Sequence, residues 1–274
     1  MTKVPISEKG KSAIDVARGA ALLAGEIMQD RFEKVKEISY KGPGDIVTDV
    51  DREVEAEVFS FLASEYPCMN LVGEESSPDL RADKGYAWIV DPIDGTRNYA
   101  YGIPLYSTVV GLAYEGTVLV GVNYDPNRDE LFGAERGKGA FLNDKRIQVS
   151  ERASLDECII GLDLSYGDVR AKYALEMVAN TVWPHMRTAR MIGSSALGLS
   201  YVAAGRTDLY LMTGLKPWDQ VAGLLLVEEA GGVTTDRMGR LATLYSDGII
   251  ASCRDIHEEF MQRTEGHLWR EAAG

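Results

Sequence analysis

The sequence predicts an α+β fold, in which a pair of helices precedes an antiparallel sheet and a further set of strands and helices. Apolar residues recur at helical spacing from 12 to 32 and again from 49 to 66. Short β-rich runs then dominate from 105 to 149, with turn signals at 114–116 and 125–128. We therefore expect two long helices and a meander in the first half of the chain.

Later elements follow from the same kind of pattern. Tyr86 to Asp91 is a short apolar run that stops at Pro92, which predicts a buried strand with Asp91 at its carboxyl end. Beyond residue 150 the pattern predicts strands over 159–164 and 208–212 and helices over 168–182, 194–204, 217–230 and 255–269. No low-complexity linker separates the halves. We expect two subdomains, 1–150 and 151–274, that form one catalytic unit with the site in the cleft between them.

Composition and charge narrow the class of protein. Asp and Glu outnumber Lys and Arg by 42 to 29, for a net charge of −13, and no basic run could follow a phosphate backbone. Three scattered cysteines support neither a disulfide framework nor a zinc site. No leader-like or membrane-spanning apolar stretch is present in the sequence. We expect a soluble cytoplasmic protein with neither nucleic acid nor a membrane as its partner.

Five carboxylates in three short motifs carry the chemistry. They are Glu74 and Glu75 in Gly-Glu-Glu-Ser, Asp91 and Asp94 in Asp-Pro-Ile-Asp-Gly-Thr, and Asp219 after Trp218. So many carboxylates cannot all stay ionised side by side without cations, and hard divalent ions such as Mg²⁺ prefer oxygen ligands. Asp91 and Asp94, with the backbone carbonyl of Ile93 between them, could hold two cations at the spacing of a two-metal phosphoryl site. The sequence predicts a metal-dependent phosphatase.

Each motif alone also has a structural interpretation. Asp-x-x-Asp-Gly-Thr commonly forms a turn with Thr96 as a helix cap, although the free N–H groups of such a helix could bind phosphate. Thr48-Asp-Val-Asp51 is a capping box, although Asp51 could act as a base toward a water near Thr96. Asp219 would be a favourable first-turn charge, and adjacent glutamates are usually solvated. A phosphatase of the haloacid dehalogenase type would need Asp at position 92, where this chain has Pro, so no aspartyl-phosphate is expected.

Four motifs in combination resemble the inositol monophosphatase family. They are Gly-Asp-Ile-Val-Thr-Asp-Val-Asp at 44–51, Gly-Glu-Glu-Ser at 73–76, Trp-Ile-Val-Asp-Pro-Ile-Asp-Gly-Thr at 88–96 and Lys-Pro-Trp-Asp-Gln-Val-Ala-Gly at 216–223. Their order and spacing match over nearly the whole chain, which is far more specific than any single motif. The resemblance implies a layered α-β-α-β-α sandwich of the sugar-phosphatase type, a Mg²⁺-dependent and Li⁺-sensitive phosphomonoesterase, and a homodimer.

The resemblance also implies a set of metal ligands. Glu74, Asp91 and the carbonyl of Ile93 would bind one Mg²⁺, and Asp91, Asp94 and Asp219 would bind a second, so that Asp91 bridges the two. A third, weaker ion would depend on Glu74. The expected cofactor is therefore two to three Mg²⁺ ions per site.

Roles toward water and substrate are implied in the same way. Asp51 and Thr96 match the pair that polarises the attacking water, and Glu74 is grouped with them as catalytic. Gly95 and Thr96 match the backbone donors to phosphate, and Glu75 would support the site without binding the ions. The family shapes its substrate pocket with the residues that correspond to Gly193, Ser194 and Ser195.

Two departures from the family pattern bear on the substrate. Arg97 stands where animal inositol monophosphatases have Thr, and its charge could reach a second anionic group of a substrate. Met212, seven residues before Asp219, stands where those enzymes have a Glu that contacts inositol hydroxyls, which weakens strict inositol specificity. The expected substrate is a small polyol or sugar phosphate, first of all inositol monophosphate. Fructose 1,6-bisphosphate, histidinol phosphate and 3′-phosphoadenosine 5′-phosphate remain alternatives, as does a catalytically silent regulatory protein that binds metal or phospholigands.

Overall fold

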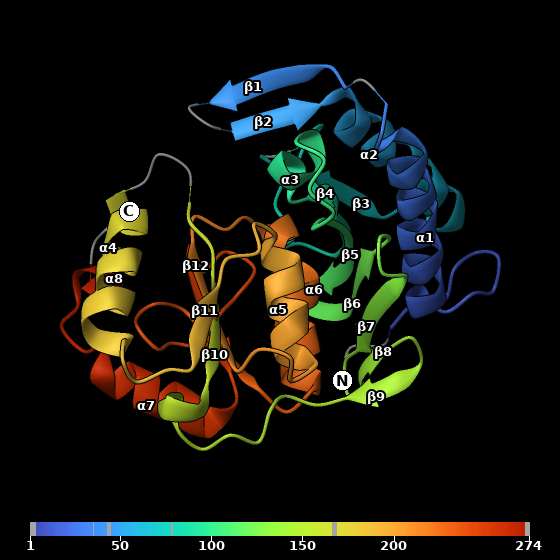
Figure 1. The fold of residues 1–274 in the computed structure, drawn as a ribbon. Helices are drawn as coiled ribbons and strands as arrows, with labels where there is room; N and C mark the ends of the chain where they lie inside the picture. Colours follow the sequence, from blue (N-terminus) through green and yellow to red (C-terminus); the bar gives the residue numbers. More distant parts are fainter. Residues whose placement is uncertain (1–3, 35, 43–44, 78, 166–168, 272–274) are drawn as a thin grey trace.

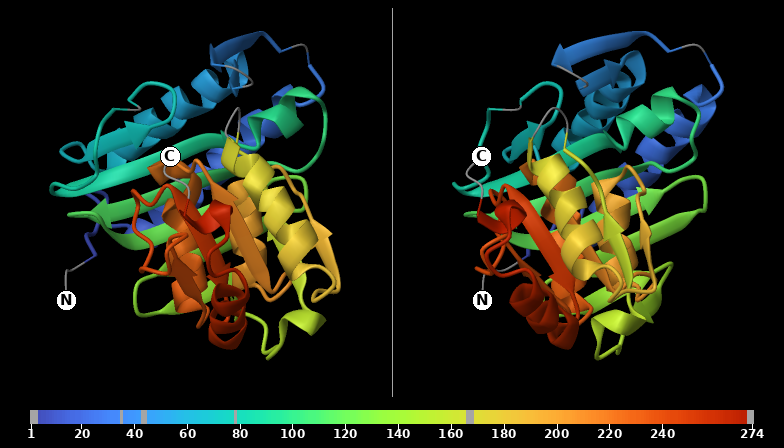
Figure 2. Two further views of the ribbon diagram at one scale, coloured as in Figure 1. Left: turned by 90° about the vertical axis from the view of Figure 1, so that its left-hand side faces the viewer. Right: turned by 60° about the vertical axis from the view of Figure 1, so that its left-hand side comes forward.

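The computed structural model describes residues 4–34, 36–42, 45–77, 79–165 and 169–271, and it arranges them in five alternating layers of helix and sheet (Figures 1 and 2). Helices α1 (Ala13–Arg31) and α2 (Asp49–Glu65) form the first layer, as their apolar spacing predicted. Ser12 caps α1 and Thr48 caps α2, each accepting a backbone N–H with its side-chain oxygen. The buried faces of both helices pack against one side of a seven-stranded sheet.

The seven-stranded sheet is the second layer, in the order β3-β4-β5-β6-β7-β8-β9. Its strands are β3 (Asn70–Gly73), β4 (Tyr86–Asp94), β5 (Ser107–Tyr114), β6 (Thr117–Asp125), β7 (Glu130–Glu135), β8 (Gly139–Leu142) and β9 (Lys145–Ile147). Only β3 and β4 are paired in parallel, and the later neighbours are antiparallel, which confirms the predicted meander. Glu115 and Gly116 in the β5–β6 turn have φ of 48° and 77°, as a tight hairpin between twisted strands requires.

Helices α5 (Ser195–Ala203) and α6 (Pro217–Glu229) form the third layer, between the two sheets. The fourth layer is a sheet in the order β11-β10-β12-β14-β13. Its strands are β10 (Ile159–Leu162), β11 (Thr188–Arg190), β12 (Leu209–Thr213), β13 (Val233–Thr235) and β14 (Gly248–Ser252). Helices α4 (Val169–Met177), α7 (Arg254–Arg263) and α8 (Leu268–Glu271) cover the outer face of this sheet. The layer order is the α-β-α-β-α sandwich that the sequence led us to expect.

Three expected elements differ from the observed ones by more than one or two residues at an end. Strand β4 continues through Pro92 to Asp94, because its ladder to β5 is irregular between Asp91 and Asp94 and does not require the N–H that proline lacks. The helix expected over 255–269 is divided into α7 and α8, and Gly266 between them has φ of 71°. In the helix expected over 168–182, residue 168 lies outside the described residues and 178–182 form a wider π-helical turn.

The hairpin of β1 (Ile38–Gly42) and β2 (Asp45–Thr48) was not predicted. Strand β1 is almost entirely exposed, so it lacks the alternation of buried and exposed residues that marks a strand in a sequence. Strand β2 contacts α2 and the short helix α3 (Thr96–Ala100) (Figure 1). The hairpin therefore lies beside two elements that carry predicted site residues.

The two large sheets come from different parts of the chain. All strands of the seven-stranded sheet precede residue 150, and all strands of the five-stranded sheet follow it. The division into subdomains at this residue remains a prediction. Within the described ranges, none of the helices combines the length and apolar character needed to cross a membrane.

Candidate active site

Three carboxylates converge where β4 meets the amino end of α6. Asp91 and Asp94 lie in the last residues of β4, and Asp219 lies in the first turn of α6. One oxygen from each side chain lies within 4.8 Å of the other two. Asp91 is only 1% exposed and Asp94 only 6%, so these carboxylates are largely removed from water. The structure thus brings together the three aspartates that the motifs placed in a metal site.

The electrostatics of this centre fit a divalent cation. Burial raises the pKa of Asp91 and of Asp219 well above the usual range of an aspartate, and the charge of Glu74 adds to both shifts. Burial also raises the pKa of Asp94 to about 6, although hydrogen bonds oppose the shift. Among the described residues, Oδ1 of Asp91 is buried without a hydrogen-bond partner. A hard cation such as Mg²⁺ would supply the missing partner and stabilise the ionised carboxylates.

Asp94 is fixed at the amino end of α5. Its Oδ1 accepts a hydrogen bond from the hydroxyl of Ser195 at 2.9 Å, and its Oδ2 accepts from the backbone N–H of Ala196 at 3.0 Å and from the hydroxyl of Ser194. Gly95 has φ of 92°, and a Cβ added to it would lie 3.2 Å from the carbonyl oxygen of Gly193. The residues predicted to contact phosphate and substrate therefore adjoin the carboxylates, with both serine hydroxyls directed at Asp94.

Asp51 uses its two carboxylate oxygens for different partners. Oδ2 accepts the backbone N–H of Thr48 at 2.8 Å, which completes the capping box of α2. Oδ1 lies 3.2 Å from the Thr96 hydroxyl oxygen, which is also 2.9 Å from the carbonyl oxygen of Ile93. Asp51 is fully buried, and burial raises its pKa to about 6. The helix-capping role and the contact with Thr96 are therefore compatible in one side chain.

Glu74 and Glu75 lie on the loop after β3, beside a lysine that sequence reasoning missed. Lys41 donates to Oε1 of Glu74 at 2.7 Å and also to Glu75. Burial raises the pKa of Glu74, and it raises that of Glu75 to about 7, while Lys41 opposes both shifts. Lys41 belongs to the unpredicted β1–β2 hairpin and is 33 residues from Glu74, so no local pattern marks it.

The predicted specificity residues lie on helix α3 and strand β12. Arg97 is half-buried on α3, and Met212 is half-buried on β12 with its sulfur 3.4 Å from the hydroxyl of Tyr210. That hydroxyl donates to Asp163 at 2.9 Å, and the other oxygen of Asp163 accepts the backbone N–H groups of residues 192 and 193 at 2.9 and 2.7 Å. Sequence reasoning missed Asp163, which falls within the strand expected over 159–164, although an acidic residue in a largely apolar run was a usable signal. Asp163 fixes the loop that leads into α5.

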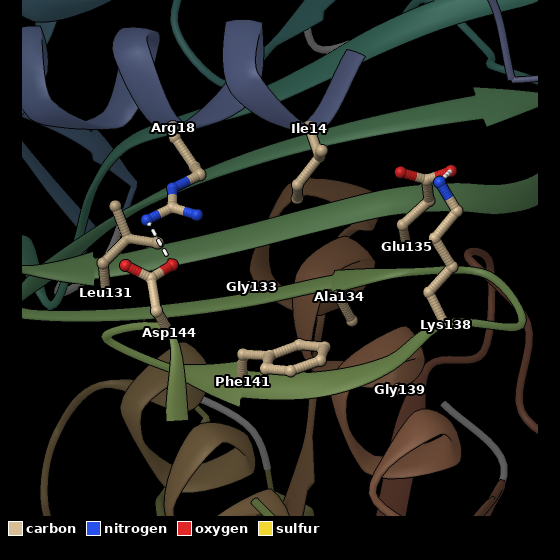
Figure 3. A pocket seen from close by; sticks show the side chains of 10 residues that line it. All are labelled: Ile14, Arg18, Leu131, Gly133, Ala134, Glu135, Lys138, Gly139, Phe141 and Asp144. Carbon is tan, nitrogen blue, oxygen red and sulfur yellow. Dashed lines mark ion pairs between the residues drawn. The ribbon is translucent and has the colours of Figure 1, made fainter. Parts of the chain in front are cut away.

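A separate pocket of about 270 Å³ lies between α1 and strands β7 and β8 (Figure 3). An apolar lining separates two ion pairs, Arg18–Asp144 and Lys138–Glu135. Of the described residues that line this pocket, none is a predicted site residue. The pocket is therefore distinct from the carboxylate centre.

Comparisons with known proteins agree with this geometry. The profile described as the inositol monophosphatase family matches residues 10–268. An inositol-1-monophosphatase of Mesorhizobium japonicum is 38% identical over 259 residues, which cover 93% of this chain and 97% of that protein. A fructose-1,6-bisphosphatase/inositol-1-monophosphatase of Thermotoga maritima is 38% identical over 239 residues, or 87% of this chain and 90% of the relative. The crystal structure of extragenic suppressor protein suhB from Bartonella henselae matches with a TM-score of 0.87 and 36% identity, covering 92% and 98% of the two chains.

The layered fold and the buried carboxylate centre, together with these matches, define a metal-dependent phosphomonoesterase. The similarity extends over both large sheets and includes every motif on which the sequence prediction rested. The chain belongs to the inositol monophosphatase family.

Proposed function

We propose that this enzyme hydrolyses small polyol or sugar phosphate monoesters, first of all inositol monophosphate. The observation that carries the proposal is the convergence of Asp91, Asp94 and Asp219 close to a Thr96–Asp51 contact. The relative from Mesorhizobium japonicum is named for inositol 1-phosphate, and the one from Thermotoga maritima also for fructose 1,6-bisphosphate. Both names support a phosphorylated polyol or sugar as the substrate here.

The carboxylates would hold two to three Mg²⁺ ions. Asp91, Asp94 and Asp219 would form the ligand set of one ion, and Asp91 with Glu74 and the Ile93 carbonyl would form that of another. When bound, Mg²⁺ supplies positive charge that stabilises phosphate oxygens and makes a water easier to deprotonate. Lys41 contacts Oε1 of Glu74, so Mg²⁺ would bind Glu74 through Oε2 or through the remaining lone pair of Oε1.

Thr96 and Asp51 would orient the attacking water. A hydroxyl has one proton, so Thr96 can donate either to the carbonyl of Ile93 or to Asp51, but not to both at once. If the Ile93 carbonyl faces a cation, Thr96 donates to Asp51 and its lone pairs accept a hydrogen bond from water. The water would then pass its proton to the Thr96 oxygen while the Thr96 hydroxyl passes its own proton to Asp51, so that Asp51 is the final proton acceptor. Pro92 stands where a phosphatase of the haloacid dehalogenase type needs its nucleophilic Asp, so we expect no covalent aspartyl-phosphate intermediate.

The finer properties of the enzyme belong to the same proposal. We expect inhibition by Li⁺, a homodimer, a cytoplasmic location and no nucleic-acid or membrane partner. Arg97 and Met212 would set the choice among substrates, with Gly95, Gly193, Ser194 and Ser195 shaping the pocket and Glu75 supporting Glu74. Histidinol phosphate and 3′-phosphoadenosine 5′-phosphate remain alternative substrates.

A panel assay tests the proposal. Purified protein is incubated with inositol 1-phosphate, fructose 1,6-bisphosphate, histidinol phosphate and 3′-phosphoadenosine 5′-phosphate, each with Mg²⁺ or with EDTA, and released phosphate is measured. We expect release from inositol 1-phosphate in Mg²⁺ and none in EDTA. Metal binding without release from any member of the panel would instead favour the catalytically silent alternative.

A further inference from the structure

A buried carboxylate on α2 accepts hydrogen bonds from the loop that carries Glu74. Glu55 is only 2% exposed. Its Oε2 accepts the backbone N–H of Glu75 and its Oε1 accepts that of Ser76, each at 2.8 Å. Both oxygens are thus committed to two consecutive peptide groups, which fixes the position and the direction of the loop directly after Glu74.

Gly73 shows how closely this carboxylate approaches the loop. A Cβ added to Gly73 would lie 2.3 Å from Oε2 of Glu55 and 2.6 Å from its Cδ, too close for any real side chain. The N–H of Gly73 donates to the hydroxyl of Ser77 at 2.8 Å. The segment is therefore fixed on both sides of Glu74, and a glycine precedes Glu74 because the carboxylate of Glu55 occupies the space of a side chain.

Helix α2 connects this loop to the Thr96 contact. Glu55 is four residues after Asp51, so the two carboxylates lie on the same face of α2, one turn apart. Asp51 contacts Thr96, whereas Glu55 holds the loop of Glu74. A single rigid helix thereby determines where Glu74 stands relative to the end of β4.

We propose that Glu55 is a positioning residue for the metal site, which aims Glu74 toward Asp91 without contacting substrate or ion. This inference rests on the proposed function, because it assumes that Glu74 binds a cation. Hydrogen-bond partners just outside a ligand set orient the ligands, and their loss typically weakens metal affinity or activity by about 10- to 100-fold. The competing explanation is that Glu55 only satisfies two buried N–H groups and so contributes to stability alone.

The test compares three variants of the full-length protein. Glu55→Gln leaves one acceptor oxygen and directs an amide NH₂ at a backbone N–H. Glu55→Asp keeps the negative charge but withdraws the carboxylate by one methylene, which separates positioning from charge. Glu57→Gln, at an exposed position of the same helix, removes the same charge and serves as the control. Three quantities are measured: Mn²⁺ affinity from the electron paramagnetic resonance signal of free ion, the Mg²⁺ concentration for half-maximal phosphate release, and the melting temperature in EDTA.

We expect Glu55→Gln and Glu55→Asp to weaken Mn²⁺ binding by about tenfold or more and to raise the Mg²⁺ requirement in parallel, with kcat at saturating Mg²⁺ within about threefold of wild type. The Glu57→Gln control should match wild type in Mn²⁺ affinity, Mg²⁺ requirement and melting temperature. Wild-type Mn²⁺ affinity in Glu55→Asp would overturn the inference, whatever its melting temperature. If Glu55→Asp does not fold, Glu55→Gln decides the question, and wild-type Mn²⁺ affinity in that variant would overturn the inference. A wild-type protein that neither binds Mn²⁺ nor releases phosphate would instead refute the proposed function.

Discussion

The hydroxyl oxygen of Thr96 lies 3.2 Å from Oδ1 of Asp51, although 45 residues separate the two in the chain. This contact joins the amino end of α2 to the first residue of α3, which follows β4 closely. Because the other oxygen of Asp51 is bound by the Thr48 N–H, the carboxylate cannot rotate away without opening the cap of α2. The pair is therefore held in place by the fold before any substrate arrives.

Removal of the Thr96 hydroxyl should therefore affect turnover more than metal binding or stability. Thr96→Val keeps the shape of the side chain but breaks the path from water to Asp51, and we expect kcat to fall by about 10²–10⁴. Thr96→Ser keeps the hydroxyl and should stay within about tenfold of wild type. Steady-state kinetics at saturating Mg²⁺ would measure both. Equal kcat values for the Val and Ser variants would show that the hydroxyl has no part in the reaction.

Asp91→Asn should abolish turnover and yet stabilise the metal-free protein. The pKa of Asp91 is raised by burial and by the neighbouring carboxylates, so a neutral amide removes an unfavourable charge. We expect less than about a tenth of wild-type kcat, a barrier increase of more than ~1.4 kcal/mol. Melting in EDTA should occur at a higher temperature than for wild type, by about 2–4 °C per kcal/mol gained. Added Mg²⁺ should raise the melting temperature of wild type alone. A lower melting temperature of the variant in EDTA would contradict this account of the site.

His257 should make unfolding pH-dependent outside the active site. This side chain is 8% exposed, its Nε2 lies 2.7 Å from the hydroxyl of Thr235, and burial lowers its pKa to about 4. The unfolded chain, with a histidine pKa of about 6.5, binds more protons between pH 6.5 and 4, so the free energy of unfolding falls as the pH decreases through this window. Gln does not bind a proton in this range. The free energy of unfolding of His257→Gln should therefore fall less than that of wild type between pH 7 and pH 4.5, by on the order of 2 kcal/mol.

Urea unfolding at pH 7 and pH 4.5 measures the free energy of unfolding of variant and wild type. Other groups titrate in the same range, so the quantity of interest is the difference between variant and wild type at each pH. His185→Gln is the matched control, because the His185 side chain is 43% exposed and contacts the surface residue Asp156. If the difference between His257→Gln and wild type is the same at both pH values, His257 is not buried in its neutral form.

Local patterns predicted the elements of this fold better than their ends. The apolar spacing of α1 and α2 and the short apolar runs of the meander were sufficient, because each of these helices buries one face and the central strands are buried on both. The continuation of β4 through Pro92 depends on how β5 pairs with it, and the exposed β1 carries no burial pattern at all. The order of the five layers came from the family resemblance.

In the candidate site, too, sequence patterns predicted only the residues that belong to short motifs. Carboxylates gathered in short motifs are visible in a sequence, and the fold does bring Asp91, Asp94 and Asp219 together. Lys41 and Glu55 were missed because their partners lie 33 and 20 or more residues away, and because Glu55 binds backbone groups that leave no trace in the residue types. Such partners become visible only once distant segments are folded against each other.

Arg97 should favour substrates with two phosphate groups. It lies on α3 directly after Thr96, and a guanidinium can bind the second phosphate of a substrate through two parallel hydrogen bonds. Arg97→Ala should lower kcat/KM for fructose 1,6-bisphosphate by about tenfold and leave that for inositol 1-phosphate within about twofold. Arg97→Lys keeps the charge and should recover part of the loss. Equal effects of Arg97→Ala on both substrates would assign this residue to the fold instead.

Met212 should make discrimination among polyol phosphates shallow. Its sulfur is 3.4 Å from the Tyr210 hydroxyl and offers inositol hydroxyls at most a weak acceptor. Met212→Glu adds an acceptor worth about 0.5–1.5 kcal/mol if neutral and more when charged, so kcat/KM for inositol 1-phosphate relative to glycerol 2-phosphate should rise by about twofold to tenfold or more. Met212→Leu adds no acceptor and should leave the ratio unchanged. If the wild-type enzyme already prefers inositol 1-phosphate over glycerol 2-phosphate by about a thousandfold, or ~4 kcal/mol, a single missing acceptor cannot have relaxed its specificity, and the selectivity must come from other contacts.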